Sequence, residues 1–223
     1  CIRDSHDIDL EKGDDFTLPS GLFKGFKGKI LFPEHHASHA ASAFYASPFQ
    51  DAAFLTMDGV GEWATTSYGI GNGNKMEVLA DIKFPNSLGL LYSAFTYYCG
   101  FKVNSGEYKL MGLAPYGIDK SEQVERFKAV ILEHLIDLKP DGSIVLNMKF
   151  FNFATGLTMC VDDKWHKIFG LPKRESETEI DQNYMDMALA IRGLGQDHVV
   201  SHGGGHCLGH PCLWAAQCYK PWS

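Results

Sequence analysis

The chain has 223 residues, and its composition of 45% hydrophobic and 21% charged residues is that of a globular protein with a sizeable core. Its formal charge of −7, from 20 Lys and Arg against 27 Asp and Glu, argues against a broad surface for nucleic acid or anionic membranes. No apolar run reaches the roughly 20 residues that span a bilayer, and no signal-peptide pattern opens the chain, so we expect a soluble, cytoplasmic protein without nucleic-acid or membrane partners.

The six cysteines of the chain indicate reduced thiols more than a disulfide framework, given this expected location. The chain begins with Cys1 and not with Met. We therefore expect the sequence to be an internal piece of a longer protein, in which residues 1–28 are the end of a preceding element.

The first half of the chain predicts strands around one helix. The apolar run KILF at 29–32 predicts a short strand, and the alanine-rich segment 36–46 predicts a helix. Three further strands follow, the first almost continuously apolar, as in a central strand, and the last alternating with a period of two. The turn residues GNGN join the second of these strands to the third, which predicts a β-meander. Its strands are expected over 52–57, 64–71 and 76–84.

The second half of the chain is richer in helix signals. Ser87 and Ser121 are suitable N-cap residues for helices over 87–98 and 121–136, and the second helix shows an amphipathic face. A strand is predicted over 143–151 after the turn residues KPDG. Another helical face recurs near residue 190. The order of elements predicts an α/β domain. The two helical faces consist of Val124, Phe127, Ile131 and Leu135, and of Ile180, Tyr184, Met187 and Ile191.

The segment PEHHASHAASAF carries the first chemical signal. His35 and His39 lie four residues apart, so a helix would present both imidazoles to one ion, whereas His36 would point elsewhere. Two imidazoles and a carboxylate are a suitable donor set for Zn²⁺ or Fe²⁺. Asp58, which follows the apolar strand 52–57, is the best nearby carboxylate, because α/β sheets place ligand sites at strand ends. The alternatives are a solvated helix end and, for MDGVGE, an ordinary tight turn.

Four blocks of the chain resemble consecutive motifs of the O-carbamoyltransferase family, which includes nodulation and antibiotic-tailoring enzymes. They are HHASHAASAFYASPF, AAFLTMDGVGEWATTS, PNSLGLLYSAFTYYCGFKVNSGEYKLMGLAPYG and ESETEIDQNYMDMALAIR. The resemblance covers residues 29–192. It implies the N-terminal part of an actin-like ATPase domain, built on ribonuclease-H-like units and incomplete in this chain. It also implies a metal, iron or alternatively zinc, held by His35, His39 and Asp58 together with an aspartate beyond the chain.

The chemistry implied by the resemblance has two stages. A separate C-terminal domain, absent here, converts carbamoyl phosphate and ATP into carbamoyl adenylate, and the actin-like domain passes the carbamoyl group to a hydroxyl of a small molecule or sugar. The metal would act as a Lewis acid on the carbonyl oxygen. Asp58, Glu62 and Glu107 are the candidates for accepting the proton of the alcohol.

Glycines and one lysine mark candidate contacts to the nucleotide. Gly59 and Gly61, which follow the strand-end aspartate, allow the backbone to approach an anionic group closely. In NSGEYKLMGLAPYG, the resemblance implies a nucleotide-facing wall, where Lys109 meets phosphate charge and N–H groups near Gly106 and Gly112 bind oxygens. The alternative for this segment is a plain helix-to-loop junction.

The segment 193–223 departs from the family pattern. It holds four histidines spaced four residues apart, but HGGGH within it is a very poor helix, so we do not expect the four to share a face. We expect this atypical tail to be out of frame, or otherwise not the natural continuation; the alternative is a truncated variant with an adventitious metal-binding tail. The residues concerned are His198, His202, His206, His210, Cys207 and Cys212.

Two other functions stay open at this point. The chain could be a non-catalytic metal- or nucleotide-binding module derived from the same fold, or another actin-like enzyme such as a sugar kinase. A kinase of that fold does not need an H-x-x-x-H pair. We expect an O-carbamoyltransferase whose isolated N-terminal fragment does not complete the reaction alone.

Overall fold

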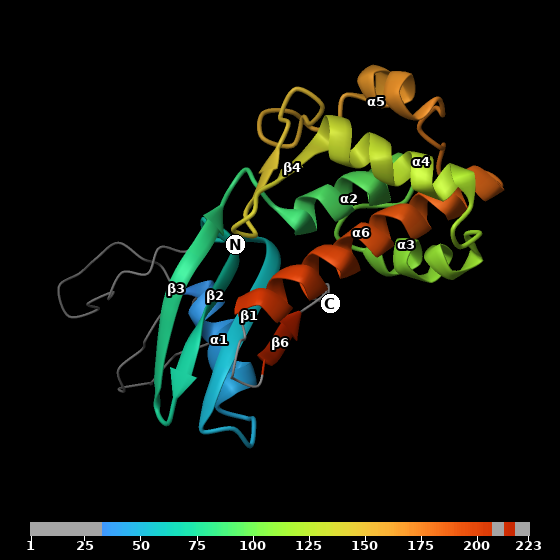
Figure 1. Cartoon of the computed structure of the whole chain (residues 1–223). Coiled ribbons are helices and arrows are strands. Elements are labelled where there is room, and N and C mark those ends of the chain that lie inside the picture. Colours follow the sequence, from blue (N-terminus) through green and yellow to red (C-terminus); the bar gives the residue numbers. More distant parts are fainter. Residues whose placement is uncertain (1–32, 207–211, 217–223) are drawn as a thin grey trace, which may run out of the picture.

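A computed structural model describes residues 33–206 and 212–216 of the chain, with the backbone alone described for 196–206 and 212–216 (Figure 1). The strand predicted over 29–32, together with Cys207 and His210, lies outside these ranges. The described part combines one four-stranded sheet, a two-stranded hairpin and several helices. The predicted α/β class is confirmed.

The larger sheet contains the predicted meander. The meander consists of β1 (Asp51–Gly61), β2 (Ala64–Asn72) and β3 (Lys75–Lys83), in which β2 pairs antiparallel with both β1 and β3. A fourth strand, β6 (Cys212–Ala216), lies parallel to β1, and the order across the sheet is β3-β2-β1-β6. Gly73 supplies the positive φ of 59° that the turn between β2 and β3 requires. The three strands expected from the sequence are therefore confirmed.

Helix α1 (His35–Phe44) covers one face of this sheet, as Figure 1 shows. Its buried residues are His36, Ala40 and Phe44, which follow one another at intervals of four and form a single stripe. The ring of Phe44 fills the space above Gly71, where a Cβ atom would lie 2.6 Å from it. Close contact with the strands thus depends on a missing side chain.

The remaining helices gather on the other side of Figure 1 and share a second core. Its largest buried side chains are aromatic and come from three different helices. Ser87 and Ser121 cap two of the helices, as predicted, by accepting hydrogen bonds from the N–H groups of Leu90 and Val124. The elements are α2 (Leu88–Tyr98), α3 (Glu107–Leu113), a 3₁₀ turn (Ala114–Tyr116), α4 (Glu122–Val130), a π turn (Ile131–Leu135), β4 (Ile136–Leu138), β5 (Ile144–Leu146), α5 (Asp162–Phe169) and α6 (Gln182–His206).

Several predicted elements of this second half have different bounds. The helix predicted over 121–136 changes to a π turn after Val130 and ends before β4, and the strand predicted over 143–151 shrinks to the three residues of β5. Helix α5 was not predicted, although it carries recognisable signals. Trp165 and Phe169 lie four residues apart on it, and Gly170 ends it with a φ of 73°.

The expectation for HGGGH was wrong. Helix α6 crosses residue 193 and continues through the three glycines to His206. Each glycine costs only about 1 kcal/mol relative to alanine, and adding residues to an existing helix is much easier than starting one. The backbone of the tail then returns to the sheet as β6. The side chains of His198, His202 and His206 lie outside the described part, so whether they bind metal stays untested.

Candidate metal centre

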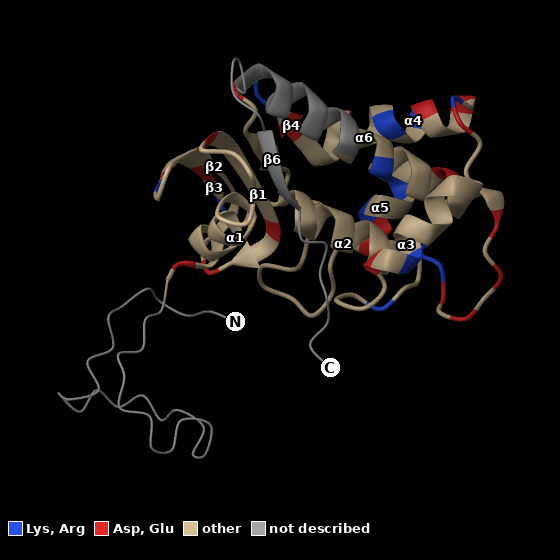
Figure 2. Ribbon diagram, turned by 90° about the horizontal axis from the view of Figure 1, so that it is seen from below, with Lys and Arg blue, Asp and Glu red and all other residues tan. Residues whose placement is uncertain are grey.

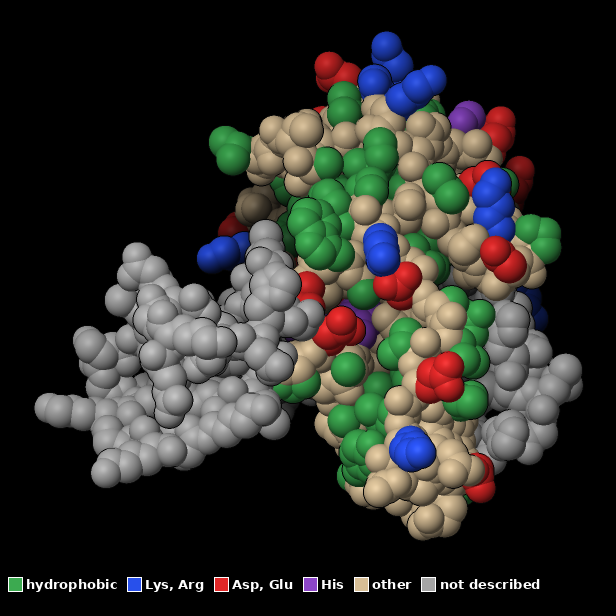
Figure 3. Space-filling view, turned by 90° about the vertical axis from the view of Figure 1, so that its left-hand side faces the viewer, with side chains coloured by type: hydrophobic (Ala, Val, Ile, Leu, Met, Phe, Trp, Pro, Cys, Tyr) green, Lys and Arg blue, Asp and Glu red, His purple; other side chains and the backbone are tan. Residues whose placement is uncertain are grey.

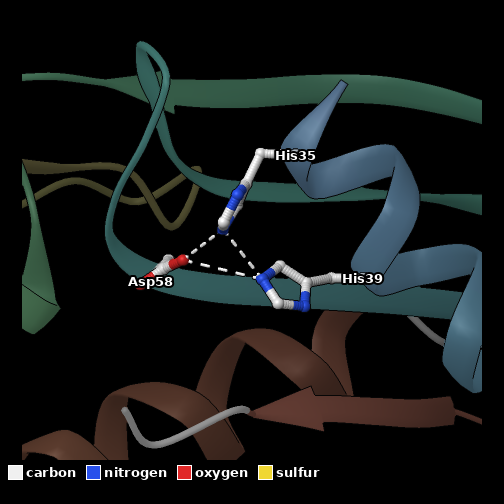
Figure 4. Close-up of side chains that lie close together, drawn as sticks. All are labelled: His35, His39 and Asp58. Atoms are coloured by element: carbon white, nitrogen blue, oxygen red, sulfur yellow. Dashed lines mark hydrogen bonds and ion pairs between the residues drawn. The ribbon is translucent and has the colours of Figure 1, made fainter. Parts of the chain in front are cut away.

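His35, His39 and Asp58 meet between α1 and β1 (Figure 4). The helical repeat places the two histidines one turn apart on the same flank of α1. On β1, alternate residues share a face, which puts Asp58 on the same side as Thr56 and Phe54, toward the helix. Residues 35 and 58 are thus brought together by the packing of α1 on the sheet.

The three side chains converge through atoms that can bind a metal. Asp58 Oδ2 lies 2.6 Å from His35 Nε2 and 3.6 Å from His39 Nε2, and the two Nε2 atoms are 2.9 Å apart. Two imidazole nitrogens and one carboxylate oxygen form a donor set that suits a divalent transition metal. The three residues therefore fit such an ion. The side chains of His35, His39 and Asp58 are 39%, 22% and 14% exposed, so the group is reached by solvent mainly at His35.

Figure 3 shows the face of the molecule on the β3 side, where acidic side chains, a histidine and hydrophobic patches lie close together. Helix α1 carries no Lys, Arg, Asp or Glu, whereas the helices opposite carry both signs (Figure 2). Among the three residues of the triad, the charges are those of the Asp58 carboxylate and of any imidazole that is protonated.

The protonation state of His39 favours metal binding. Burial lowers the pKa of His39 below its usual 6.5 and the neighbouring His35 lowers it further, while Asp58 acts in the opposite direction. A lowered pKa means that the imidazole is neutral over a wider range of pH. The neutral imidazole is the form that binds a metal ion, so less proton release is needed at His39 when the ion binds.

Helix α2 braces the end of β1. The Gly59 N–H donates to Asp58 Oδ1 at 2.6 Å, while the Ser87 hydroxyl contacts the carbonyl oxygens of Gly59 and Asp58 at 2.7 and 3.2 Å. A Cβ atom at Gly89 would lie 2.7 Å from the Asp58 carbonyl oxygen. The sequence identified Ser87 as a helix cap but offered no signal for this second role.

Gly61 makes room for the histidines. A Cβ atom there would lie 2.3 Å from His35 Cδ2 and 2.7 Å from His36 Cδ2, closer than carbon atoms can approach. From the sequence, Gly59 and Gly61 are expected to let the backbone approach an anion. In the structure, the Gly59 N–H donates to Asp58, and the open side of Gly61 faces imidazole rings.

The other two carboxylates named as proton acceptors occupy different places. Glu62 follows Gly61 in the turn between β1 and β2, half-buried, with a φ of 62° that non-glycine residues seldom adopt. Glu107 begins α3, and its carboxylate accepts hydrogen bonds from the Ser93 hydroxyl and from the N–H groups of Asn104 and Gly106. Glu62 is thus the sequence neighbour of Gly61, whereas Glu107 holds a loop together.

The proposed nucleotide contacts on α3 form a separate group. Lys109 and Gly112 are exposed on that helix, and Gly106 is its N-cap residue. Figures 1 and 2 both show α3 well apart from α1. The structure does not bring these residues to the triad.

From the sequence, His36 was expected only to point away from the other two histidines, and no role was predicted for it. Its ring is 5% exposed, and its Nδ1 lies 2.8 Å from Thr56 Oγ1 and 2.9 Å from Ser67 Oγ. Burial lowers the pKa of His36 from 6.5 to about 4, so the ring is neutral near pH 7. A signal was present in its spacing, since Ala40 and Phe44 follow it on the same stripe.

This mixed α/β fold brings two histidines and one carboxylate together, which makes them a candidate centre for a divalent metal ion. Comparison with known families narrows the class, because residues 8–207 match the family described as carbamoyltransferase N-terminus. The chain belongs to that family. This finding confirms the resemblance seen in the sequence motifs.

Known relatives agree with the family. The uncharacterized protein sll1178 of Synechocystis sp. is 56% identical over 174 residues, which cover 78% of this chain and 27% of the relative. The nodulation protein NolNO of Sinorhizobium fredii is 45% identical over 89 residues, or 40% of this chain and 13% of the relative. The nodulation protein NolO of Bradyrhizobium diazoefficiens is 40% identical over 83 residues, or 37% of this chain and 15% of the relative. The chain thus spans about a quarter or less of each of these relatives.

Among the helices of the described ranges, none combines the length and the apolar character needed to cross a bilayer.

Proposed function

We propose that this chain is the N-terminal, metal-holding part of an ATP-dependent O-carbamoyltransferase. In this proposal a carbamoyl group passes from carbamoyl adenylate to a hydroxyl of a small molecule or sugar. The observation that carries it is the convergence of His35, His39 and Asp58 within a chain of the carbamoyltransferase N-terminal family. The named nodulation relatives agree with a biosynthetic role.

The fold assignment in this proposal is an incomplete actin-like ATPase domain built on a ribonuclease-H-like unit. Its support is the sheet, in which an antiparallel meander is joined on the β1 side by a strand parallel to β1. The other half of such a domain would supply a fourth metal ligand, an aspartate. That half, and the domain that makes carbamoyl adenylate from carbamoyl phosphate and ATP, would lie outside this chain.

The metal in this proposal is Fe²⁺ or Zn²⁺, and its ligands are His35 Nε2, His39 Nε2 and Asp58 Oδ2. When bound, such an ion supplies Lewis acidity toward a carbonyl oxygen. The neutral state of His39 leaves its nitrogen available, and the hydrogen bond from Gly59 fixes the Asp58 carboxylate. Together these residues present a preorganised set of donors on a helix and a strand.

The proton acceptor we favour is Glu62. Asp58 already interacts with both histidines and Glu107 with three donors, whereas nothing within the described part of the chain hydrogen-bonds the Glu62 carboxylate. A general base must reach the hydroxyl proton, and Glu62 follows Gly61, which touches His35. Lys109, near Gly106 and Gly112 on α3, is the residue we propose to meet phosphate charge of ATP.

Metal titration tests the centre. Co²⁺, a spectroscopic substitute for Fe²⁺ or Zn²⁺, should bind the chain and develop a visible absorption band. His35→Ala and Asp58→Ala should each weaken binding by more than the roughly 10- to 100-fold typical of residues around a ligand shell. His166→Ala, on an exposed position of α5, is the matched control. Undiminished Co²⁺ binding in both His35→Ala and Asp58→Ala would refute the proposal.

A second candidate function is a non-catalytic metal-binding module, which the isolated triad would also allow. Supplying the missing regions in trans separates the two. An enzyme fragment should restore transfer of labelled carbamoyl from carbamoyl phosphate, in the presence of ATP, to a hydroxyl acceptor, and the Asp58→Ala fragment should not. A module would leave the mixture inactive with either fragment.

A further inference from the structure

The stripe by which α1 contacts the sheet contains one polar residue. Ala40 and Phe44 are apolar and fully or nearly fully buried, at 0% and 2% exposure, yet His36, one turn earlier, buries an imidazole at 5% exposure. Burying a polar ring is unfavourable unless hydrogen bonds replace water. An apolar residue would pack there without that penalty, so the ring must serve something other than packing.

The partners of His36 come from two strands at one level of the sheet. Thr56 on β1 and Ser67 on β2 lie directly opposite each other, and both hydroxyl oxygens approach His36 Nδ1, at 2.8 and 2.9 Å. The Thr56 hydroxyl also contacts the Ser67 carbonyl oxygen, at 3.2 Å. One ring nitrogen thus joins the first turn of α1 to the two central strands of the four-stranded sheet.

The same residues border the metal centre. His35 immediately precedes His36, and Asp58 lies two residues beyond Thr56 on the same strand and the same face. The hydrogen bond between His36 and Thr56 therefore spans the same gap between α1 and β1 that the ligand atoms span. It also sets the rotation of α1, because a helix whose His36 faces the strands must turn His35 and His39 toward Asp58.

We propose that His36 is a positioning residue of the metal centre, whose Nδ1 bonds to Thr56 and Ser67 hold α1 at the rotation and distance where His35, His39 and Asp58 meet. This inference rests on the proposed metal centre. The other ring nitrogen, Nε2, is buried without a hydrogen-bond partner among the described residues, so the ring forms its hydrogen bonds there through Nδ1 alone. Partners around ligand residues typically alter metal affinity 10- to 100-fold when removed.

Two substitutions at this position separate packing from hydrogen bonding. His36→Leu fills the space but forms no hydrogen bond, and should weaken Co²⁺ binding by about 10- to 100-fold with an altered absorption band. His36→Asn places an amide atom where Nδ1 lies, and should recover most of the affinity and the wild-type band. His166→Leu on α5 is the matched control and should change neither.

The strand hydroxyls supply a second line of evidence. Thr56→Val with Ser67→Ala removes both partners while leaving His36 in place, and should weaken Co²⁺ binding in the same direction as His36→Leu. Each variant is checked by circular dichroism for native secondary structure. If His36→Leu fails to fold, the strand double variant decides.

The outcomes are distinct. Wild-type affinity and an unchanged Co²⁺ band in a folded His36→Leu chain, or in the folded strand double variant, would overturn the positioning role while leaving the metal centre standing. Absence of Co²⁺ binding by the wild-type chain would overturn both proposals together. Loss in His36→Leu with recovery in His36→Asn supports the positioning role.

Discussion

The helical part of the chain and the layer formed by α1 and the sheet are built differently. In the helical part, the fully buried Trp165 is surrounded by Phe95, Tyr98 and Phe169, with ring centroids 4.8 to 5.4 Å away. In the α1 layer, the ring of Phe44 packs on Gly71, and the buried His36 is held by hydrogen bonds to Thr56 and Ser67. The helical core is stabilised by contacts among large rings, which have no strict direction. The α1 layer also depends on hydrogen bonds, which do.

This difference separates stability from site geometry. Dispersion contacts among large rings are many and individually weak, so the helical core resists unfolding without specifying any one atom. A hydrogen bond to Nδ1 and a ring over Gly61 each constrain a particular atom near the ligands. We expect substitutions in the helical core to lower stability most, and small substitutions in the α1 layer to alter metal affinity out of proportion to stability.

The largest expected effect on stability is that of Trp165→Ala. It removes an entire ring that packs on four others and a hydrogen bond from Nε1 to the Phe150 carbonyl, and should lower the free energy of unfolding by about 3–5 kcal/mol. Urea unfolding measures the loss. Leu157→Ala, at a fully exposed position, should stay within about 0.5 kcal/mol of wild type. A loss below about 1 kcal/mol for Trp165→Ala would refute the packing account of this core.

The metal-free chain should lose stability in acid because of His36. Its pKa is lowered in the folded state, from 6.5 to about 4, so the unfolded chain binds a proton that the folded chain lacks between these values. This contribution is complete above pH 6.5 and is lost as the pH falls to about 4, and it amounts to about 3 kcal/mol, since each pH unit in that window contributes about 1.4 kcal/mol. The lowered pKa of His39 acts in the same direction.

Urea unfolding at a series of pH values checks this expectation. His36→Asn, which has no titrating ring, should show a shallower decline between pH 6.5 and 4 than wild type. Parallel curves for the two proteins would contradict a buried neutral ring at this position.

Gly61→Ala should damage the site more than the fold. The added methyl would meet His35 Cδ2 at 2.3 Å and His36 Cδ2 at 2.7 Å, so the histidines must move. We expect a destabilisation of about 1–3 kcal/mol together with weaker Co²⁺ binding. Gly195→Ala on α6 is the control, since nothing lies within 4 Å of its Cβ, and it should gain up to about 1 kcal/mol. Unchanged Co²⁺ affinity in Gly61→Ala would show that this contact does not place His35.

The smallest expected effect is that of Glu107→Gln. Glutamine offers a single carboxamide oxygen to three donors, so we expect a loss of about 1 kcal/mol with unchanged Co²⁺ affinity. Glu125→Gln, in an exposed ion pair with Lys128, is the control and should change stability by less than about 0.5 kcal/mol. Carbamoyl transfer abolished by Glu107→Gln without a change in stability would instead restore Glu107 as a general base.

Local features of the sequence predicted much of the fold. The turn at Gly73 and the caps at Ser87 and Ser121 depend on neighbours a few residues away, and each was found where expected. The strand predicted over 76–84 also forms, but its period of two does not bury one face, since none of its residues is fully buried. The family blocks likewise singled out His35, His39 and Asp58, and the structure places them together. Their role as metal ligands stays a prediction.

Contacts between distant segments decided the remainder. His36 meets hydroxyls 20 and 31 residues further along the chain, and β6 joins β1 across most of the sequence. No helix or strand periodicity encodes which partners a buried imidazole will find, because the partners are chosen when layers pack. Sequence pattern thus determined the strands of the meander, the two capped helix starts and the identity of the three converging side chains. Only tertiary packing decided that Gly61 clears the histidine rings and that His36 ties α1 to the sheet, since each depends on atoms separated along the chain but adjacent in space.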